Sequence, residues 1–251
     1  MKTPVEFNPV LKQVFATDKV TDQEGKERIV DDRISEDEAR ILYNTVLAAG
    51  AGNTAEIGMA FGVSALTIAQ AHHDTNSTFK HVSVDPNQFS HYKGAALVSL
   101  QKAGLDKYVE IMEGPAHMKV PELIEKDFRL RMAFIDGWHT FDYTLVDFFL
   151  IDKILEPGGY VAFHDSYGIA KQKVVKFILA YRKYAFATDV MKFEKEPFMK
   201  TLKFFVWRIM KHPRLLFSKL YWKFQFKNSS GLIVLKKLEN YEPPFDFYRH
   251  F

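Results

Sequence analysis

Short apolar runs alternate with longer amphipathic stretches between Asn53 and Asp165. The short runs have the length of buried strands, and the stretches between them repeat their apolar positions at helical spacing. This alternation is typical of a parallel sheet whose strands are joined by crossover helices. The predicted strands are residues 54–58, 80–85, 108–114, 131–136 and 159–165, and the predicted helices are residues 62–71, 89–103, 116–126, 140–154 and 168–184.

A further helix is predicted before this repeat, over residues 36–49. It is expected to begin after Ser35, because Glu38 stands three residues later in the arrangement of a capping box. We expect this helix to close over one edge of the site.

Two more strands are predicted after the repeat, over residues 185–193 and 231–239. Roughly 35 residues separate them, which is too many for a hairpin loop, so an insert is expected there. Apolar residues within it fall at helical spacing on both sides of Pro213, which predicts two helical segments. We interpret the chain as one α/β domain. Its parts are an N-terminal arm and capping helix (1–52), a ligand-binding core (53–192), a basic aromatic helical insert (193–229), and the last strand with a tail (230–251).

Charge is unevenly distributed along the chain. The formal net charge is only +3, which argues against a dedicated nucleic-acid binder. Residues 195–227, however, hold nine Lys or Arg and one acid, a net charge of +8 that leaves −5 for the remainder. We therefore expect the insert to be a capping helical pair with a solvated basic face, a membrane-interface surface over residues 198–227, or a lid or homodimer contact. Nucleic acid is not the expected partner, because single-strand binders display such residues on a sheet or groove.

Composition excludes several classes of site. The chain has no cysteine, which rules out disulfides, Cys-ligated zinc and thiol nucleophiles. No run approaches the roughly 20 apolar residues of a membrane-spanning helix, and the N-terminus lacks the apolar region of a secretory signal. A cytoplasmic protein is expected, with membrane association as an alternative.

The stretch AEIGMAFGVSALTIA follows the first predicted strand with a glycine-containing turn. Gly58 and Gly62 lie in this turn, and Ser64 lies at the opening of the next helix. Glycines let the backbone approach a ligand closely, and a helix start offers free N–H groups to a carboxylate. The motif predicts a nucleotide-like ligand; the alternative is an ordinary strand-to-helix turn.

Asp85 ends the second predicted strand, 27 residues after Gly58. In Rossmann-type sites an acid about 20 residues after the glycine turn binds the ribose hydroxyls. An acid at this place disfavours a 2′-phosphate, and no GxxxxGK[ST] phosphate loop occurs in the chain. The alternative is an ordinary loop aspartate.

Four further polar side chains follow the next two strands, in FIDGWH and AFHDSY. They are Asp136, His139, His164 and Asp165. Open α/β sheets bind ligands at this carboxyl edge. Two carboxylates and an imidazole predict a divalent-metal site, and a second imidazole predicts a general base. The carboxylates suit Mg²⁺, whereas Mn²⁺, Fe²⁺ or Zn²⁺ would accept the imidazole as well. The alternatives are a base without metal, or side chains that only bond loop backbone.

The motifs EIGMAFGVSAL, VSVDP, MEGPA, AFIDGWHTFDYTLVDF and LEPGGYVAFHDS resemble, in order and spacing, class I methyltransferases of the catechol and macrocin O-methyltransferase-like groups, the methyltransferase family 24 type. The resemblance covers about residues 35–183. It implies a Rossmann-like sheet of seven mostly parallel strands, the last one antiparallel, and S-adenosylmethionine as the cofactor.

The resemblance also implies roles for single residues. It implies that the methionine part of the cofactor is held by Glu56, Gly58, Gly62 and Ser64, the ribose by Asp85, and the adenine between Gly114 and Ala116. Asp136 would lie between the cofactor and a metal. In catechol-type members an acidic or Asp-Asn pair completes the metal site where this chain has His164 and Asp165. The same members use a lysine as base where His139 stands, so His139 resembles a replacement base.

These features predict transfer of a methyl group to a hydroxyl of a small molecule such as a sugar, a phenol or a lipid-linked metabolite. Whether Mg²⁺ or another divalent cation assists the reaction is left open by the sequence. Two alternatives remain. One is a nucleotide-dependent oxidoreductase or hydroxylase on the same fold. The other is a non-catalytic scaffold that docks on a membrane or nucleic acid through the basic insert.

Overall fold

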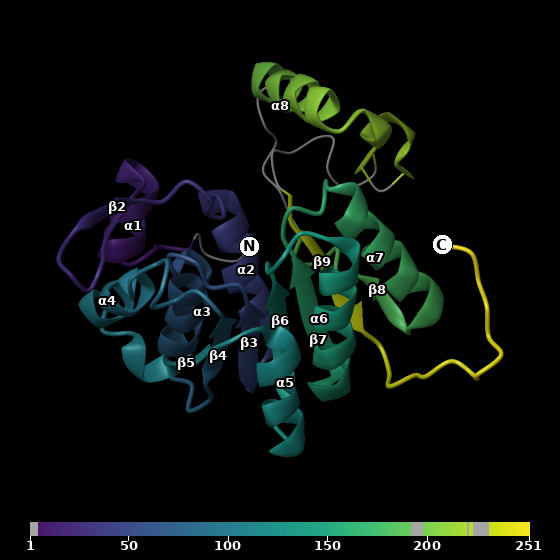
Figure 1. The fold of residues 1–251 in the computed structure, drawn as a ribbon, viewed down its shortest axis with the longest axis horizontal. Helices are drawn as coiled ribbons and strands as arrows, with labels where there is room; N and C mark the ends of the chain where they lie inside the picture. The colour runs from purple at the N-terminus through teal and green to yellow at the C-terminus, as the bar shows by residue number, and fades with distance from the viewer. Residues whose placement is uncertain (1–4, 192–197, 220, 223–230) are drawn as a thin grey trace.

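Seven strands form one twisted sheet at the centre of the protein (Figure 1). The computed structural model describes residues 5–191, 198–219, 221–222 and 231–251. The strand order is β5-β4-β3-β6-β7-β9-β8. β9 runs antiparallel to both of its neighbours, and the other pairs are parallel. The strands are β3 (Asn53–Ile57), β4 (His81–Asp85), β5 (Val109–Glu113), β6 (Leu130–Ile135), β7 (Leu155–Phe163), β8 (Tyr184–Phe186) and β9 (Ile233–Lys237). The predicted Rossmann-like fold is confirmed.

Helices cover both faces of this sheet. α1 to α4 pack with one buried cluster and α5 to α7 with the other. The helices are α1 (Pro9–Thr17), α2 (Glu36–Ala49), α3 (Val63–Asp74), α4 (Ala95–Lys102), α5 (Ala116–Glu125), α6 (Phe141–Ile154), α7 (Ile169–Tyr181) and α8 (Phe198–Lys211), with short 3-10 helices η1 (Asp106–Tyr108) and η2 (Pro213–Phe217). None of the helices in the described ranges is long and apolar enough to span a membrane.

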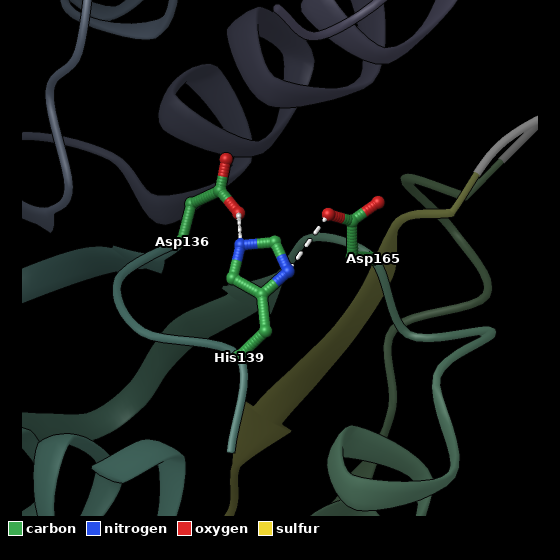
Figure 2. Close-up of side chains that lie close together, drawn as sticks. All are labelled: Asp136, His139 and Asp165. Carbon is green, nitrogen blue, oxygen red and sulfur yellow. Dashed lines mark ion pairs between the residues drawn. The ribbon is translucent and has the colours of Figure 1, made fainter. Parts of the chain in front are cut away.

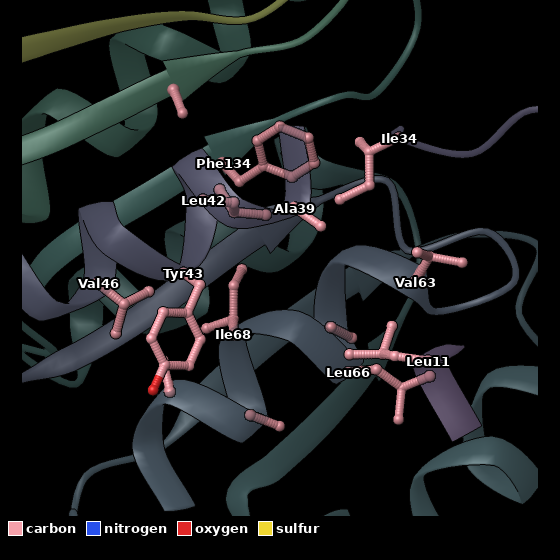
Figure 3. Packing of buried hydrophobic residues seen from close by; sticks show 14 of the residues in the cluster. Leu11, Ile34, Ala39, Leu42, Tyr43, Val46, Val63, Leu66, Ile68 and Phe134 are labelled. Carbon is pink, nitrogen blue, oxygen red and sulfur yellow. The ribbon is translucent and has the colours of Figure 1, made fainter. Parts of the chain in front are cut away.

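Side-chain alternation along the strands produces the two clusters. Met132 and Phe134 of β6 face the helices α2 and α3, whereas Ala133 and Ile135 face the helices α5 to α7. Figure 3 shows Phe134 beside Leu42 of α2 within the first cluster. Burial on both faces is what a parallel sheet between helices requires, so the short apolar runs of the sequence are explained.

The capping box of α2 forms as the sequence predicts. The Ser35 hydroxyl accepts a hydrogen bond from the Glu38 backbone N–H at 3.3 Å, and a Glu38 carboxylate oxygen accepts from the Ser35 N–H at 2.8 Å. The helix spans the predicted residues 36–49. Its start is therefore fixed beside the carboxyl edge of the sheet.

The N-terminal arm contains more structure than the sequence indicated. Besides α1 it forms a hairpin of β1 (Lys19–Thr21) and β2 (Glu27–Ile29). Gln70 of α3 ties the arm down, because its side chain accepts from the Asn8 N–H at 2.9 Å and donates to the Glu6 carbonyl at 2.8 Å. The arm thus packs on the same face as α2 and α3.

Two predicted elements have different bounds in the structure. The helix predicted over 89–103 is wrong in its first half, because Lys93 and Gly94 adopt left-handed φ values of 51° and 66° and only residues 95–102 are helical. The strand predicted over 185–193 is wrong over residues 187–191, where the backbone turns and the Val190 N–H donates to the Ala187 carbonyl, and its last two residues lie outside the described ranges.

The insert holds the first of its two predicted helical segments. α8 covers the first, and η2 follows directly after His212. Leu220 and residues 223–230 of the second segment lie outside the described residues, as do residues 192–197. In Figure 1, α8 stands apart from the two helical layers, above the end of the sheet from which the loop after β7 emerges.

Candidate active site

Five strand ends meet at one edge of the sheet. Backbone hydrogen bonds continue past the strands: the Gly58 N–H donates to the Val84 carbonyl at 2.9 Å, and the Asp136 N–H donates to the Ile57 carbonyl at 2.8 Å. In the same way, the His164 N–H donates to the carbonyl of Ile135 in β6 at 3.3 Å. Parallel strands present their carboxyl ends together, so the predicted residues of separate motifs come to one place.

The glycine turn after β3 is closely packed against the backbone of Asp136 and against Ala96. Gly58 has a φ of 88°, and a Cβ there would lie 2.3 Å from the Asp136 carbonyl oxygen. Gly62 has a φ of 84°, and its Cβ would lie 2.6 Å from the Ala96 Cβ. Gly62 is also the N-cap of α3 and provides no side-chain cap, so the first N–H groups of this helix are directed at the edge. Both glycines are required by conformation and by space.

Two residues predicted at this turn are buried more deeply. Glu56 is fully buried, accepts a hydrogen bond from the Ser83 hydroxyl at 2.5 Å, and lies 3.3 Å from Nε2 of His81. Ser64 is 6% exposed in the first turn of α3. In this structure Glu56 links β3 to β4, so its contact with a ligand stays a prediction.

Asp85 organises the glycine turn through its carboxylate. One oxygen accepts hydrogen bonds from the Met59 and Ala60 N–H groups, both at 2.9 Å, and the other accepts from the Asn87 N–H at 2.7 Å. The Asp85 carbonyl accepts from the Gly114 N–H at 3.2 Å, which brings the end of β5 beside it. Ala116 begins α5 two residues later. The ribose and adenine positions implied by the resemblance are therefore adjacent, although the contacts themselves stay predictions.

Gln88 is a polar residue of this region that the sequence did not indicate. Its amide nitrogen donates to the Ala60 carbonyl at 2.9 Å. Its buried carbonyl oxygen has no hydrogen-bond partner among the described residues. An unsatisfied buried acceptor is costly unless a ligand or water completes it, so the glycine turn has an unused polar atom beside it. No spacing rule signals such a residue.

His139 lies between two carboxylates at the same edge (Figure 2). Its Nδ1 is 3.1 Å from Oδ2 of Asp165, and its Nε2 is 3.9 Å from Oδ1 of Asp136. The imidazole is 57% exposed, so a substrate can reach it. Burial and the charge of Lys171 lower the pKa of His139 below its usual value, against the opposing effect of Asp165. His139 is therefore neutral at neutral pH and able to accept a proton.

His164 is enclosed by two other carboxylates. Its Nδ1 lies 3.1 Å from Oδ2 of Asp136, and its Nε2 lies 3.4 Å from Oε2 of Glu38. Although burial opposes it, the charges of Asp136 and Glu38 raise the pKa of His164 well above its usual value. The charged imidazole is therefore favoured between these two carboxylates. In this structure both ring nitrogens of His164 face carboxylates, and its role as a metal ligand stays a prediction.

Glu38 and Lys171 complete the surroundings of Asp136. Although burial raises it, the His164 charge and hydrogen bonds lower the pKa of Glu38 to about 2. Lys171 of α7 is 1% exposed, and its Nζ lies 3.4 Å from Oδ1 of Asp136. Asp136 keeps a pKa below its usual value, since His164 and Lys171 outweigh the effect of burial. Sequence reasoning missed both residues; the only signal was a lysine on the inward face of a predicted helix.

The described residues contain one group with metal-ligand spacing at this edge. Asp136, His139 and Asp165 each offer an atom, and these atoms lie within 4.8 Å of one another. The group differs from the predicted set by having His139 in place of His164. A metal there would compete with Lys171 for Asp136 and would take the imidazole that can act as base.

Comparisons with known proteins agree with this geometry. A family model described as a methyltransferase domain matches residues 55–166, which contain the whole edge from the glycine turn to Asp165. Tricin synthase 1 of Oryza sativa subsp. japonica is 30% identical over 132 residues, which are 53% of this chain and 46% of that protein. The chain thus spans about half the length of the curated relative that it matches.

Solved structures share the fold. An O-methyltransferase from Bacillus cereus in complex with SAH has a TM-score of 0.59 at 16% identity, over 73% of this chain and 84% of that chain. An O-methyltransferase from Streptomyces achromogenes involved in tomaymycin synthesis, in complex with SAM, has a TM-score of 0.56 at 16% identity, over 93% of this chain and 92% of that chain. These findings confirm the resemblance and the fold that the sequence predicted.

Proposed function

We propose that this chain, whose residues 55–166 match a family model described as a methyltransferase domain, is an S-adenosylmethionine-dependent O-methyltransferase acting on a hydroxyl of a small molecule. One observation carries the proposal. A neutral, accessible imidazole, His139, lies between two carboxylates at the same sheet edge as an uncapped glycine turn. A proton acceptor and a binding place for an amino acid carboxylate are what this reaction requires.

The glycine turn fits the cofactor in chemical terms. The first N–H groups of α3 suit the carboxylate of its methionine part, and the buried Gln88 oxygen suits a donor group. In this proposal Asp85 holds the ribose and the turn at Gly114 holds the adenine, which the hydrogen bond between the two residues supports. When bound, the cofactor supplies an electrophilic methyl group on a sulfonium.

His139 acts as the general base in this proposal. The Asp165 carboxylate beside Nδ1 favours the tautomer that carries its proton there, which leaves Nε2 to accept the proton of the substrate hydroxyl. Asp136 and Asp165 then stabilise the imidazolium that forms. Deprotonation makes the hydroxyl oxygen a stronger nucleophile, and alignment with the methyl group provides further rate enhancement.

Charge balance favours a reaction without a metal. Asp136, Asp165 and Glu38 contribute three negative charges, and His164 and Lys171 contribute two positive charges. Burial raises the pKa of Asp147, which lies beneath the loop at Gly137, to about 7, so it adds only part of a charge at neutral pH. The cofactor sulfonium would bring the set near neutrality. A divalent ion would add two positive charges beside Lys171, which is unfavourable in a partly buried site.

The acceptor stays a sugar, a phenol or a lipid-linked hydroxyl in this proposal. In this proposal the residues that face it come from the N-terminal arm, the loop after β7 and the insert, whose α8 lies above the sheet in Figure 1. The sequence also predicts two alternatives for the insert, which are membrane contact through residues 198–227 and a homodimer contact.

Methyl transfer from labelled S-adenosylmethionine tests the proposal. The purified chain is incubated with panels of phenols, sugars and extracted lipids, in EDTA and with Mg²⁺, and products are examined by mass spectrometry. His139→Ala serves as the inactive control and His73→Ala, an exposed histidine on α3, as the matched one. Transfer in EDTA that needs His139 is expected. Transfer that appears only with Mg²⁺ would overturn the metal-free mechanism, and transfer independent of His139 would overturn the assignment of the base.

A further inference from the structure

We propose that α8 and η2 form a surface that binds anionic phospholipid membranes and holds the active site over them, so that the methyl acceptor is a membrane-resident hydroxyl compound. The membrane surface is defined as residues 198–217. The statement about the acceptor rests on the proposed function, whereas the statement about membrane binding does not.

An apolar stripe on α8 faces away from the protein. Met199, Leu202, Val206 and Met210 follow one another at helical spacing, with Met199 65% and Met210 80% exposed. The stripe continues into η2, where Phe217 is 89% exposed. Together with Lys203 and Trp207, these α8 residues line one shallow hollow. Exposed apolar surface of this extent on one helix marks a binding face.

Positive charge surrounds the stripe. Residues 198–222 contain six Lys or Arg and no acid. Lys203 and Lys211 are exposed on α8, and Arg214 is exposed on η2. A helix that buries Met, Val and Trp among acyl chains while Lys and Arg meet anionic headgroups is typical of membrane-interface helices. The charge complementarity therefore selects an anionic membrane as the occupant of this face.

The opposite side of α8 is anchored to the protein. Arg208 is 1% exposed, and its guanidinium lies over the Tyr167 ring at 5.4 Å from the centroid. The His212 ring also contacts Tyr167, with centroids 5.8 Å apart. Trp207 lies at the border of the two sides, because it lines the outward hollow and its ring also lies 6.2 Å from the Tyr167 ring. Because the inward side is occupied by these contacts, the outward stripe is the one available to a membrane.

Tyr167 connects the membrane surface to the active site. It lies two residues after Asp165, and burial and the Asp165 carboxylate raise the pKa of its phenol above the usual value. Asp165 in turn lies 3.1 Å from His139. Two residues, Tyr167 and Asp165, thus connect Arg208 of the membrane surface to the base His139. A membrane-resident acceptor would reach His139 from that side.

A second copy of the chain could also cover the membrane surface. A symmetric contact through this face would bring its cations against those of the partner, which is unfavourable. The described residues of α8 and η2 offer no acid to offset them. The membrane is therefore the better complement, and self-association becomes an outcome of the test.

Vesicle co-sedimentation of the full chain tests the inference. The vesicles are phosphatidylcholine alone, or equal parts of phosphatidylcholine and phosphatidylglycerol. Binding is expected to the anionic vesicles only and to weaken with salt. The variant Lys203→Glu/Lys211→Glu should bind at least about tenfold more weakly, because each cation near an anionic surface adds to affinity. Val206→Gln/Met210→Gln should also weaken binding, through the lost apolar insertion.

The matched control reverses two cations at the other end of the sheet, Lys107→Glu/Lys126→Glu, and should bind like the unaltered chain. S-adenosylhomocysteine binding, measured on each variant, should stay unchanged and shows that the site is intact. Equal loss of vesicle binding in the control, no binding of the unaltered chain, or self-association that the α8 variants abolish would overturn the membrane assignment. If vesicle binding holds while methyl transfer to lipid extracts is absent, only the acceptor assignment is overturned.

Discussion

Gly58 is packed directly against the backbone of Asp136. A Cβ on Gly58 would lie 2.3 Å from the Asp136 carbonyl oxygen, and the Asp136 N–H donates to the Ile57 carbonyl one residue earlier at 2.8 Å. The turn that is proposed to hold the cofactor and the loop that carries the base are therefore one packed unit. A shift in either moves the other.

Gly58→Ala is expected to impair both parts of this unit. The new methyl group must displace backbone rather than a flexible side chain, in addition to the roughly 1–2 kcal/mol cost of a left-handed conformation. S-adenosylhomocysteine affinity and thermal stability should both fall. Gly104→Ala is the matched control, because Gly104 also has a positive φ of 67° but has open space around its Cβ. It should show the conformational cost alone; equal losses in both variants would contradict the packing argument.

The rate of methyl transfer should depend on the protonation of His139. Only the neutral imidazole can accept a proton, so kcat/KM should rise with pH through the pKa of His139 and then level off. Burial and Lys171 lower this pKa, so the midpoint is expected below the ordinary value of about 6.5. His139→Ala should reduce the rate by roughly 10²- to 10⁴-fold and remove this limb. A limb that persists in the variant would assign the titration to another group.

Removal of the His164 imidazolium should destabilise the fold. His164→Asn leaves the 95%-buried Glu38 and the nearby Asp136 without their shared cation, and breaking a buried pair from one side costs about 3–5 kcal/mol. Glu38→Gln in the same chain should restore part of this loss. His73→Asn, which breaks an exposed pair with Asp74, should change stability by no more than about 0.5 kcal/mol. Urea denaturation gives the free energy of unfolding of the unaltered chain and of the three variants.

The contribution of Glu38 to stability should be lost at low pH. Its folded pKa of about 2 lies below the unfolded value of about 4.3, so the folded state favours the ionised form. The stabilisation is fully present above the unfolded pKa and disappears as the pH falls toward 2. Denaturation midpoints of the unaltered chain and Glu38→Gln should therefore converge on acidification. A constant gap between them would show that the ion pair is not its source.

Asp147 is expected to oppose folding above its unfolded pKa, and most strongly at neutral and alkaline pH. Burial raises its pKa to about 7, above the unfolded value of about 3.9. Its ionisation therefore costs folding free energy increasingly as the pH rises between those two values. Asp147→Asn should stabilise the protein by on the order of 1–3 kcal/mol at pH 8 and by less at pH 5. Glu125→Gln, an exposed acid on α5, should show no such trend in the same denaturation series.

Local sequence patterns predicted most of the strands of the sheet. They also predicted which residues lie together at its carboxyl edge. The capping box at Ser35 set the start of α2, and apolar runs located the five parallel strands within a few residues. Once the strands are parallel, the ends at Gly58, Asp85 and Asp136 must share an edge. These features follow from neighbours in sequence or from the topology alone.

The pairing of side chains at that edge could not be predicted in the same way. Glu38 reaches His164 across 126 positions of sequence, and Lys171 reaches Asp136 from a helix on the opposite side of the sheet. Both contacts depend on how α2 and α7 pack, which periodicity does not specify. For this reason the sequence could not predict that His164 contacts Glu38 and Asp136.

Calorimetric titration with S-adenosylhomocysteine, first in EDTA and then with Mg²⁺, tests the cofactor site most directly. Asp85→Ala removes the carboxylate that holds the glycine turn, and Asp246→Asn in the C-terminal tail is the matched control. We expect one site with an affinity on the order of micromolar in EDTA, unchanged by Mg²⁺ and by Asp246→Asn and lost in Asp85→Ala. Absence of binding in every condition would contradict the methyltransferase function.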